Sequence, residues 1–221
     1  ARSQPIDQKK FTIITNGFDR DDFTRLPTYN RHADRPLRFV TIGAMSREYH
    51  CKALQRFLRA FERLEKKGLI NPPGCRIEML SSIDPNLFRE KDSDLPIHYG
   101  GFLPHQEALA YCAESDVLFF ILHADFSKNS YPGKLFEYLP LGRPILGLTA
   151  KGIVSDLMTR YTLGWCVDDR DQEALDQTIL TVYNLWKRNE LPTIVSSTIQ
   201  QFERRTLTAK LADIFTQVSG A

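Results

Sequence analysis

The chain has 221 residues, enough for one large domain or for one and a half average ones, with a substantial core. Its apolar fraction of 42% and charged fraction of 25% are ordinary for a globular protein and speak against disorder. The formal net charge is +2 without a long block of either sign, so nothing points to a nucleic-acid partner. No apolar run reaches the roughly 18 residues of a membrane span, and the first residues show no signal-peptide pattern.

Cysteines and acidic pairs give no indication of a metal site. The four cysteines are far apart and form no Cys-x-x-Cys pair, so we expect reduced thiols and a cytoplasmic protein. Asp-x-Asp occurs at residues 19–21, 92–94 and 169–171, in polar loops of an Asp-rich chain, which is close to what chance gives. We therefore expect no bound metal.

The N-terminal part of the chain is irregular. Residues 11–15 are β-branched and predict a short strand that ends at the turn signal Asn16-Gly17. Residues 21–36 are polar, contain two prolines and show no periodicity, which predicts a linker. The chain begins without Met, which suggests a fragment or a processed product.

From residue 37 onward strands and helices alternate. Strands are predicted at residues 37–43, 76–80, 97–99, 117–122, 144–149 and 165–167. Helices are predicted at residues 54–64 before a stop at Gly68, at 105–112, after Pro132, at 151–161, at 175–186 and at 193–218, with a long loop at 84–96. About six βα units predict a doubly wound, mostly parallel, Rossmann-like α/β sheet with a long C-terminal helix.

The stretch from Asn129 to Gly147 follows the apolar run 117–122, which is typical of a central strand buried on both faces. Ligands bind at the carboxyl ends of such strands. Lys134, beside free N–H groups of a helical turn, suits an anion such as a diphosphate, and Glu137, one turn on, suits sugar hydroxyls. An ordinary strand–helix unit that exposes a Lys and a Glu fits the spacing equally well.

The segments Pro132-Gly-Lys-Leu-Phe-Glu-Tyr138 and Gly142-Arg-Pro-Ile145 resemble the donor-site signature of family 4 glycosyltransferases, which have the two-domain GT-B fold. The resemblance covers about residues 11–218. It implies that Glu137 holds the ribose of a nucleotide sugar and that the preceding loop lies against the donor. The loop residues concerned are Asn129, Ser130, Tyr131, Pro132 and Gly133. The family usually has Glu-x7-Glu; here Asn129 occupies the first position, where it offers hydrogen bonds but no carboxylate.

Two further loops match donor-binding loops of the family. The turn from Gly43 to Arg47 lacks the Gly-x-Gly-x-x-Gly of dinucleotide-binding dehydrogenases, which argues against an oxidoreductase. In the family this turn approaches the donor diphosphate, and Arg47 matches a phosphate-binding Arg. Lys52 matches a phosphate-binding Lys less closely, and a Lys exposed to solvent is the alternative interpretation. Phe102 and Leu103 match a loop that lies against the nucleotide base, with packing at a strand end as the alternative.

The resemblance implies the donor-binding half of a retaining glycosyltransferase of polysaccharide biosynthesis. Its substrate would be an NDP-sugar, no cofactor or metal would be needed, and Arg47 and Lys134 would stabilise the leaving diphosphate. Residues 1–36 would be an interdomain strand and linker left from the N-terminal half, and residues 37–192 the nucleotide-sugar-binding domain. Residues 193–221 would be a helix that crosses back toward the missing N-terminal acceptor-binding domain.

The isolated chain is therefore expected to bind nucleotide and to transfer nothing. The full-length protein would be cytoplasmic, with room for a peripheral contact at the inner face of the membrane. Two other classes stay open at this point. One is a sugar-nucleotide epimerase of the same fold, and the other is a non-catalytic α/β interaction module with a degenerate donor site.

Overall fold

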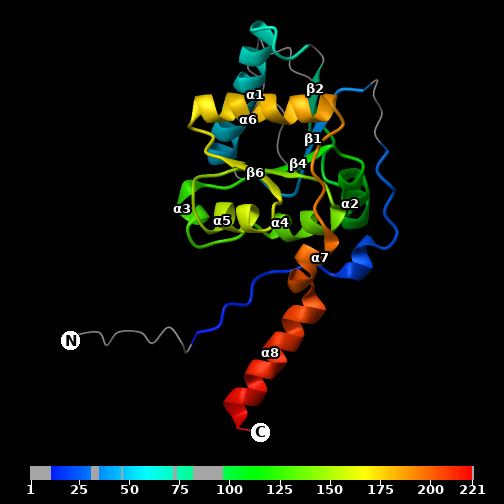
Figure 1. Cartoon of the computed structure of the whole chain (residues 1–221), viewed down its shortest axis with the longest axis vertical. Helices are drawn as coiled ribbons and strands as arrows, with labels where there is room; N and C mark the ends of the chain where they lie inside the picture. Colours follow the sequence, from blue (N-terminus) through cyan, green and yellow to red (C-terminus); the bar gives the residue numbers. More distant parts are fainter. Residues whose placement is uncertain (1–10, 31–34, 46, 72–73, 82–96, 221) are drawn as a thin grey trace, which may run out of the picture.

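A computed structural model describes residues 11–30, 35–45, 47–71, 74–81 and 97–220. Its centre is a six-stranded parallel sheet in the order β3-β2-β1-β4-β5-β6 (Figure 1). The strands are β1 Leu37–Ile42, β2 Cys75–Leu80, β3 Ile97–Tyr99, β4 Val117–Ile121, β5 Ile145–Leu148 and β6 Gly164–Val167. The predicted doubly wound sheet is confirmed, and the strand order reverses between β1 and β4.

Helices cover both faces of the sheet (Figure 1). One hydrophobic cluster joins the sheet to α1 (Arg47–Lys66) and α6 (Gln172–Lys187). A second cluster lies on the other face, against α2 (His105–Ala113), α4 (Gly133–Tyr138) and α5 (Ile153–Arg160). All five residues of β4 are buried, as the uninterrupted apolar run predicted.

The first βα unit forms for the reasons seen in its sequence. The predicted apolar face of α1 is buried against the sheet, where Phe57 and Phe61 pack edge-on against Phe39 of β1. The helix ends at Lys66, and just beyond it Gly68 has a φ of +67°, in the left-handed region that a glycine adopts without strain. Its N–H bonds to the carbonyl of Glu65 at 2.8 Å, which closes the last turn.

The expected strand at residues 11–15 is wrong: these residues pair with no strand in the described part of the chain. Just after them, Phe18 forms an isolated bridge with Glu203. Nor do the described residues after it form a free linker, because the 3-10 helix Arg20–Phe23 follows and Tyr29 and Arg35 are bound to the buried carboxylate of Asp116. The predicted loop at 84–96 lies outside the described residues.

The expected single helix at residues 193–218 is divided into α7 (Ser196–Ile199), a 3-10 turn and α8 (Arg204–Ser219). Glu203 has an extended backbone because Phe18 bonds on both sides of it: Phe18 N donates to the Phe202 carbonyl and Arg204 N donates to the Phe18 carbonyl. Tertiary pairing thus overrides local helix propensity. Beyond this point α8 projects away from the domain (Figure 1).

Candidate functional site

A cavity of about 220 Å³ opens at the carboxyl edge of the sheet, beside the point where the strand order reverses. We call it the edge cavity. Its lining consists of Ile42, Gly43, Leu80, Phe102, Leu103, His105, Ala108, Lys134 and Glu137. The structure thus brings together five predicted site residues from three separate segments: Gly43, Phe102, Leu103, Lys134 and Glu137.

Lys134 places its ammonium over the turn that follows β1. A Cβ built on Gly43 would lie 3.9 Å from Lys134 Cε and 4.0 Å from Nζ, so the two residues face each other directly. Gly43 has a φ of +85°, which a residue with a side chain rarely adopts. At this turn the backbone is therefore bare, in the sense that no side chain covers it, and it faces the ammonium of Lys134.

The electrostatics of Lys134 suit an anionic ligand. Burial lowers the pKa of its ammonium to about 8, although the nearby carboxylate of Glu137 acts in the opposite direction. Within the described ranges no carboxylate lies at ion-pair distance from Lys134. A desolvated cation that has no carboxylate at ion-pair distance gains most from an anion that enters its cavity.

Glu137 and the aromatic loop form the rim of the edge cavity. The Glu137 side chain is 39% exposed, and its carboxylate lies 3.8 Å from Nε2 of His105, so it can accept hydrogen bonds from hydroxyl groups of a ligand. Phe102 is 77% exposed, which rules out core packing for that side chain, whereas Leu103 is half-buried and packs against the core. His105 is a lining residue that the sequence analysis did not identify as a site residue.

The loop before α4 is not part of the lining. Its first residues follow a short helix, α3 (Ala124–Ser127), and Ser130 N donates to the Phe126 carbonyl at 2.9 Å. Asn129 is exposed, and Tyr131 is half-buried against Phe136. Gly133 faces open space, because a Cβ there would meet nothing within 4 Å. Arg47 begins α1, but its side chain lies outside the described residues.

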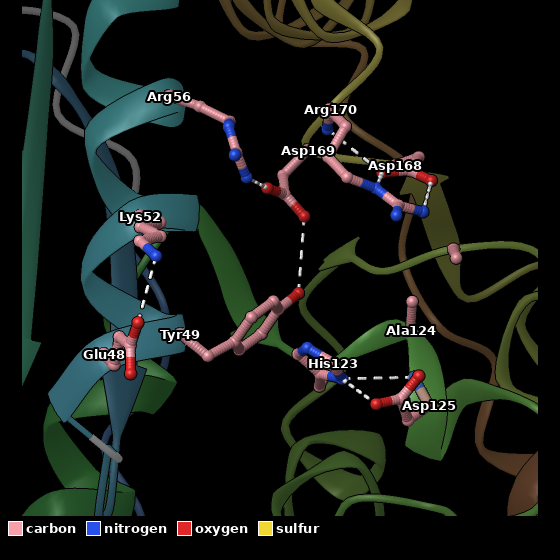
Figure 2. Close-up of a pocket in the computed structure, with 11 residues that line it drawn as sticks. Glu48, Tyr49, Lys52, Arg56, His123, Ala124, Asp125, Asp168, Asp169 and Arg170 are labelled. Carbon is pink, nitrogen blue, oxygen red and sulfur yellow. Dashed lines mark hydrogen bonds and ion pairs between the residues drawn. The ribbon is translucent and has the colours of Figure 1, made fainter.

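A second cavity, of about 440 Å³, lies at the same edge between α1 and the ends of β4, β5 and β6 (Figure 2). We call it the charged cavity. Figure 2 shows that its charged groups face one another in pairs, Arg56 with Asp169, Arg170 with Asp168 and Lys52 with Glu48. Its lining consists of Glu48, Tyr49, Lys52, Arg56, His123, Ala124, Asp125, Ala150, Asp168, Asp169 and Arg170.

Residues that line the charged cavity form hydrogen bonds with one another across it. The buried carboxylate of Asp169 accepts from Arg56 at 2.5 Å and from the Tyr49 hydroxyl at 3.3 Å, which joins α1 to the loop after β6. His123 Nδ1 accepts from Asp125 N at 3.2 Å and caps α3. The buried carboxylate of this cavity, Asp169, therefore has its partners within the protein. The described residues contain no cluster of three His, Cys, Asp or Glu that suits a metal ion.

Comparison with known proteins identifies the family. Residues 36–184 match the family model described as "Glycosyl transferases group 1". The chain belongs to this glycosyltransferase family. No curated protein matches the chain. Among its described residues, no helix is long and apolar enough to cross a membrane.

Solved structures of this glycosyltransferase fold match nearly the whole chain. A glycosyltransferase from Rickettsia africae ESF-5 superimposes with a TM-score of 0.69 at 15% identity, over 96% of this chain and 58% of that one. The apo form of the lipopolysaccharide outer core galactosyltransferase WaaB gives 0.66 at 12% identity, over 96% and 57%. A putative UDP-N-acetylglucosamine 2-epimerase from Listeria monocytogenes gives 0.54 at 15% identity, over 90% and 51%.

At these low sequence identities, the structural similarity establishes the fold alone. The chain spans little more than half the length of the solved structures it matches, and it corresponds to the C-terminal half of GT-B glycosyltransferases. The GT-B fold expected from the sequence is therefore confirmed for this half.

Proposed function

We propose that the chain is the donor-binding half of a retaining glycosyltransferase and that an NDP-sugar binds at the edge cavity. The observation that carries the proposal is the desolvated ammonium of Lys134, which faces the bare backbone of Gly43 at the point where the strand order reverses. Glu137 lines the same cavity, one helical turn away. A cation for the diphosphate and a carboxylate for the ribose then act on one ligand.

In this proposal each group has one task. Lys134 and Arg47 bind the diphosphate and stabilise the negative charge that grows on it as the bond to the sugar breaks. Glu137 accepts hydrogen bonds from the ribose hydroxyls, and Phe102 and Leu103 contact the base. The loop from Asn129 to Gly133, which is not part of the lining of the edge cavity, contacts the part of the donor that extends beyond this cavity. No metal is required, because the positive charge is supplied by side chains.

Acceptor binding is assigned to an N-terminal domain of the full-length protein. Support comes from α8, whose apolar residues Leu211, Phe215 and Val218 are 39%, 64% and 81% exposed. Such a row on a helix that leaves the domain is suited to packing against another domain. By itself the chain then binds the donor nucleotide and transfers no sugar.

The first test is the thermal stability of the chain with UDP, GDP, dTDP or ADP. A nucleotide at about 100 times its dissociation constant should add roughly 2.7 kcal/mol, seen as a rise in Tm. Glu137→Ala should abolish that rise, whereas Glu190→Ala, at an exposed site after α6, should keep it. The proposal is wrong if none of the four nucleotides raises the Tm, or if Glu137→Ala responds like the unaltered chain.

A second test separates sugar transfer from epimerisation, which solved structures of this fold also include. The full-length protein is incubated with the NDP-sugar whose base the first test identifies, and the products are analysed. A transferase releases the nucleoside diphosphate and extends an acceptor. An NDP-sugar that returns with an inverted hydroxyl, and no released nucleotide, would contradict transfer.

A further inference from the structure

Tyr138 occupies an unusual place where β1 and β4 part. β1 pairs with β2 along its whole length, from Leu37 to Ile42. Its pairing with β4 covers only Phe39↔Val117 and Val40↔Leu118, although β4 continues to pair with β5 up to Ile121. The two central strands therefore separate at their carboxyl ends, next to the edge cavity.

The Tyr138 hydroxyl lies where the next hydrogen bond of this ladder would be. If the register continued, Ile42 would face Phe120, and its N–H would donate to the carbonyl of Phe119. The same offset occurs on the other edge of β1, where Gly43 N donates to Leu80 O at 3.0 Å. Instead, Ile42 N donates to the Tyr138 hydroxyl at 3.1 Å, and that hydroxyl donates to Phe119 O at 3.3 Å.

The helix that carries Tyr138 also carries the ligand groups of the edge cavity. Lys134 lies one turn before Tyr138 in α4, and Glu137 is its immediate neighbour. Tyr138 itself is fully buried, and burial raises the pKa of its phenol far above the usual range, so the hydroxyl keeps its proton at neutral pH. One side chain thus fixes α4 to both central strands.

We propose that Tyr138 is a positioning residue of the donor site. Its hydroxyl replaces one hydrogen bond of the β1–β4 ladder, holds the two strands apart at their ends, and sets the distance between the Gly43 turn and Lys134. This inference rests on the proposed function, because it assumes that the diphosphate binds between those two groups. Tyr138 contacts no ligand itself; it acts through Ile42, which precedes Gly43.

The test compares Tyr138→Phe with Tyr183→Phe in the full chain. Tyr183 is the control because it is also a buried tyrosine whose hydroxyl accepts from a backbone N–H, that of Asn71 at 3.4 Å. It belongs to α6 and does not line the edge cavity. The thermal-stability test identifies the nucleoside diphosphate, and its affinity is then measured under conditions in which each variant is fully folded. Tyr138→Phe should lose at least tenfold in affinity for the diphosphate and much less for the corresponding nucleoside. Tyr183→Phe should bind both as the unaltered chain does.

A measurement on the unaltered chain covers the case in which Tyr138→Phe does not fold. Binding of the nucleoside diphosphate should slow amide exchange of Ile42 at least tenfold, because the ligand favours the arrangement in which its N–H bonds to Tyr138. Exchange of the Asn71 amide should not change. An Ile42 exchange rate that stays constant while the nucleotide binds would overturn the inference.

The outcomes separate this inference from the function on which it rests. An unaltered chain that binds no nucleoside diphosphate overturns both. An unaltered chain that binds, together with a Tyr138→Phe variant of equal diphosphate affinity, overturns the positioning role alone. Equal losses of diphosphate and nucleoside affinity in Tyr138→Phe also contradict it, because they would indicate general damage rather than a misplaced phosphate site.

Discussion

Lys134→Met should make the free chain more stable and its nucleotide binding weaker. The ammonium is costly to keep in the folded protein, since burial moves its pKa from 10.5 to about 8. At about 1.4 kcal/mol per pKa unit, this shift corresponds to an upper value between about 3 and 4 kcal/mol. Met has a similar length and shape but no charge, so it removes the cost without leaving a void.

The pH dependence gives this prediction a sign that can be checked. The folded pKa of Lys134 is lower than the unfolded one, so the unfolded chain holds the proton more tightly. The destabilisation of the folded state by the buried ammonium is fully present below about pH 8, decreases between pH 8 and 10.5, and is absent above that range. The stability gained by Lys134→Met should therefore be largest at pH 7 and decrease as the pH rises toward 10.

Urea denaturation at pH 7.0 and 9.5 measures both points, with Lys52→Met as the matched control. Lys52 is 61% exposed and paired with Glu48, so its replacement should change the free energy of unfolding by less than about 0.5 kcal/mol. Lys134→Met should also lose most of its affinity for the nucleoside diphosphate. A variant that is no more stable than the unaltered chain, or that binds the nucleotide as well, would refute the reasoning.

Two further predictions use the same site and the opposite edge of the sheet. In the unaltered chain, affinity for the nucleoside diphosphate should fall about tenfold between pH 7 and pH 9, because the charged fraction of Lys134 falls from about 0.9 to about 0.1. Calorimetric titration at each pH measures this affinity. Lys134→Arg stays charged, so its affinity should not change over this pH range; a fall of equal size would assign the effect to another group. Asp116→Asn should cost about 3 kcal/mol in urea denaturation, because the fully buried carboxylate binds Arg35 at 2.7 Å. A loss below about 1 kcal/mol would mean that this ion pair contributes little.

Local patterns were enough to predict the sheet and most of its helices. The run 117–122 is typical of a strand buried on both faces, and the apolar face of α1 with Gly68 behind it predicted both that helix and its end. In each case the determining interactions lie within a few residues of one another. A single sequence contains that information directly.

Three features that the sequence did not reveal depend on distant partners. The helix expected at 193–218 is interrupted at Glu203 because Phe18, at the other end of the chain, bonds to its neighbours. The linker residue Arg35 reaches Asp116 across 81 positions. Arg56 and Asp169, which join two walls of the charged cavity, are 113 positions apart. No periodicity or turn pattern can indicate such pairs.

The donor site combines both kinds of information. The motif around Lys134 and Glu137 identified two groups, but spacing alone could not place them against Gly43, which lies about ninety positions earlier and meets them only because β1 and β4 are neighbours. Within α4, residues 134, 137 and 138 point to different partners: a turn, a cavity rim and a strand ladder. A helix of six residues is too short to be held by its own hydrogen bonds. Its position over the sheet must therefore come from buried contacts, and Tyr138 supplies the directional part of them.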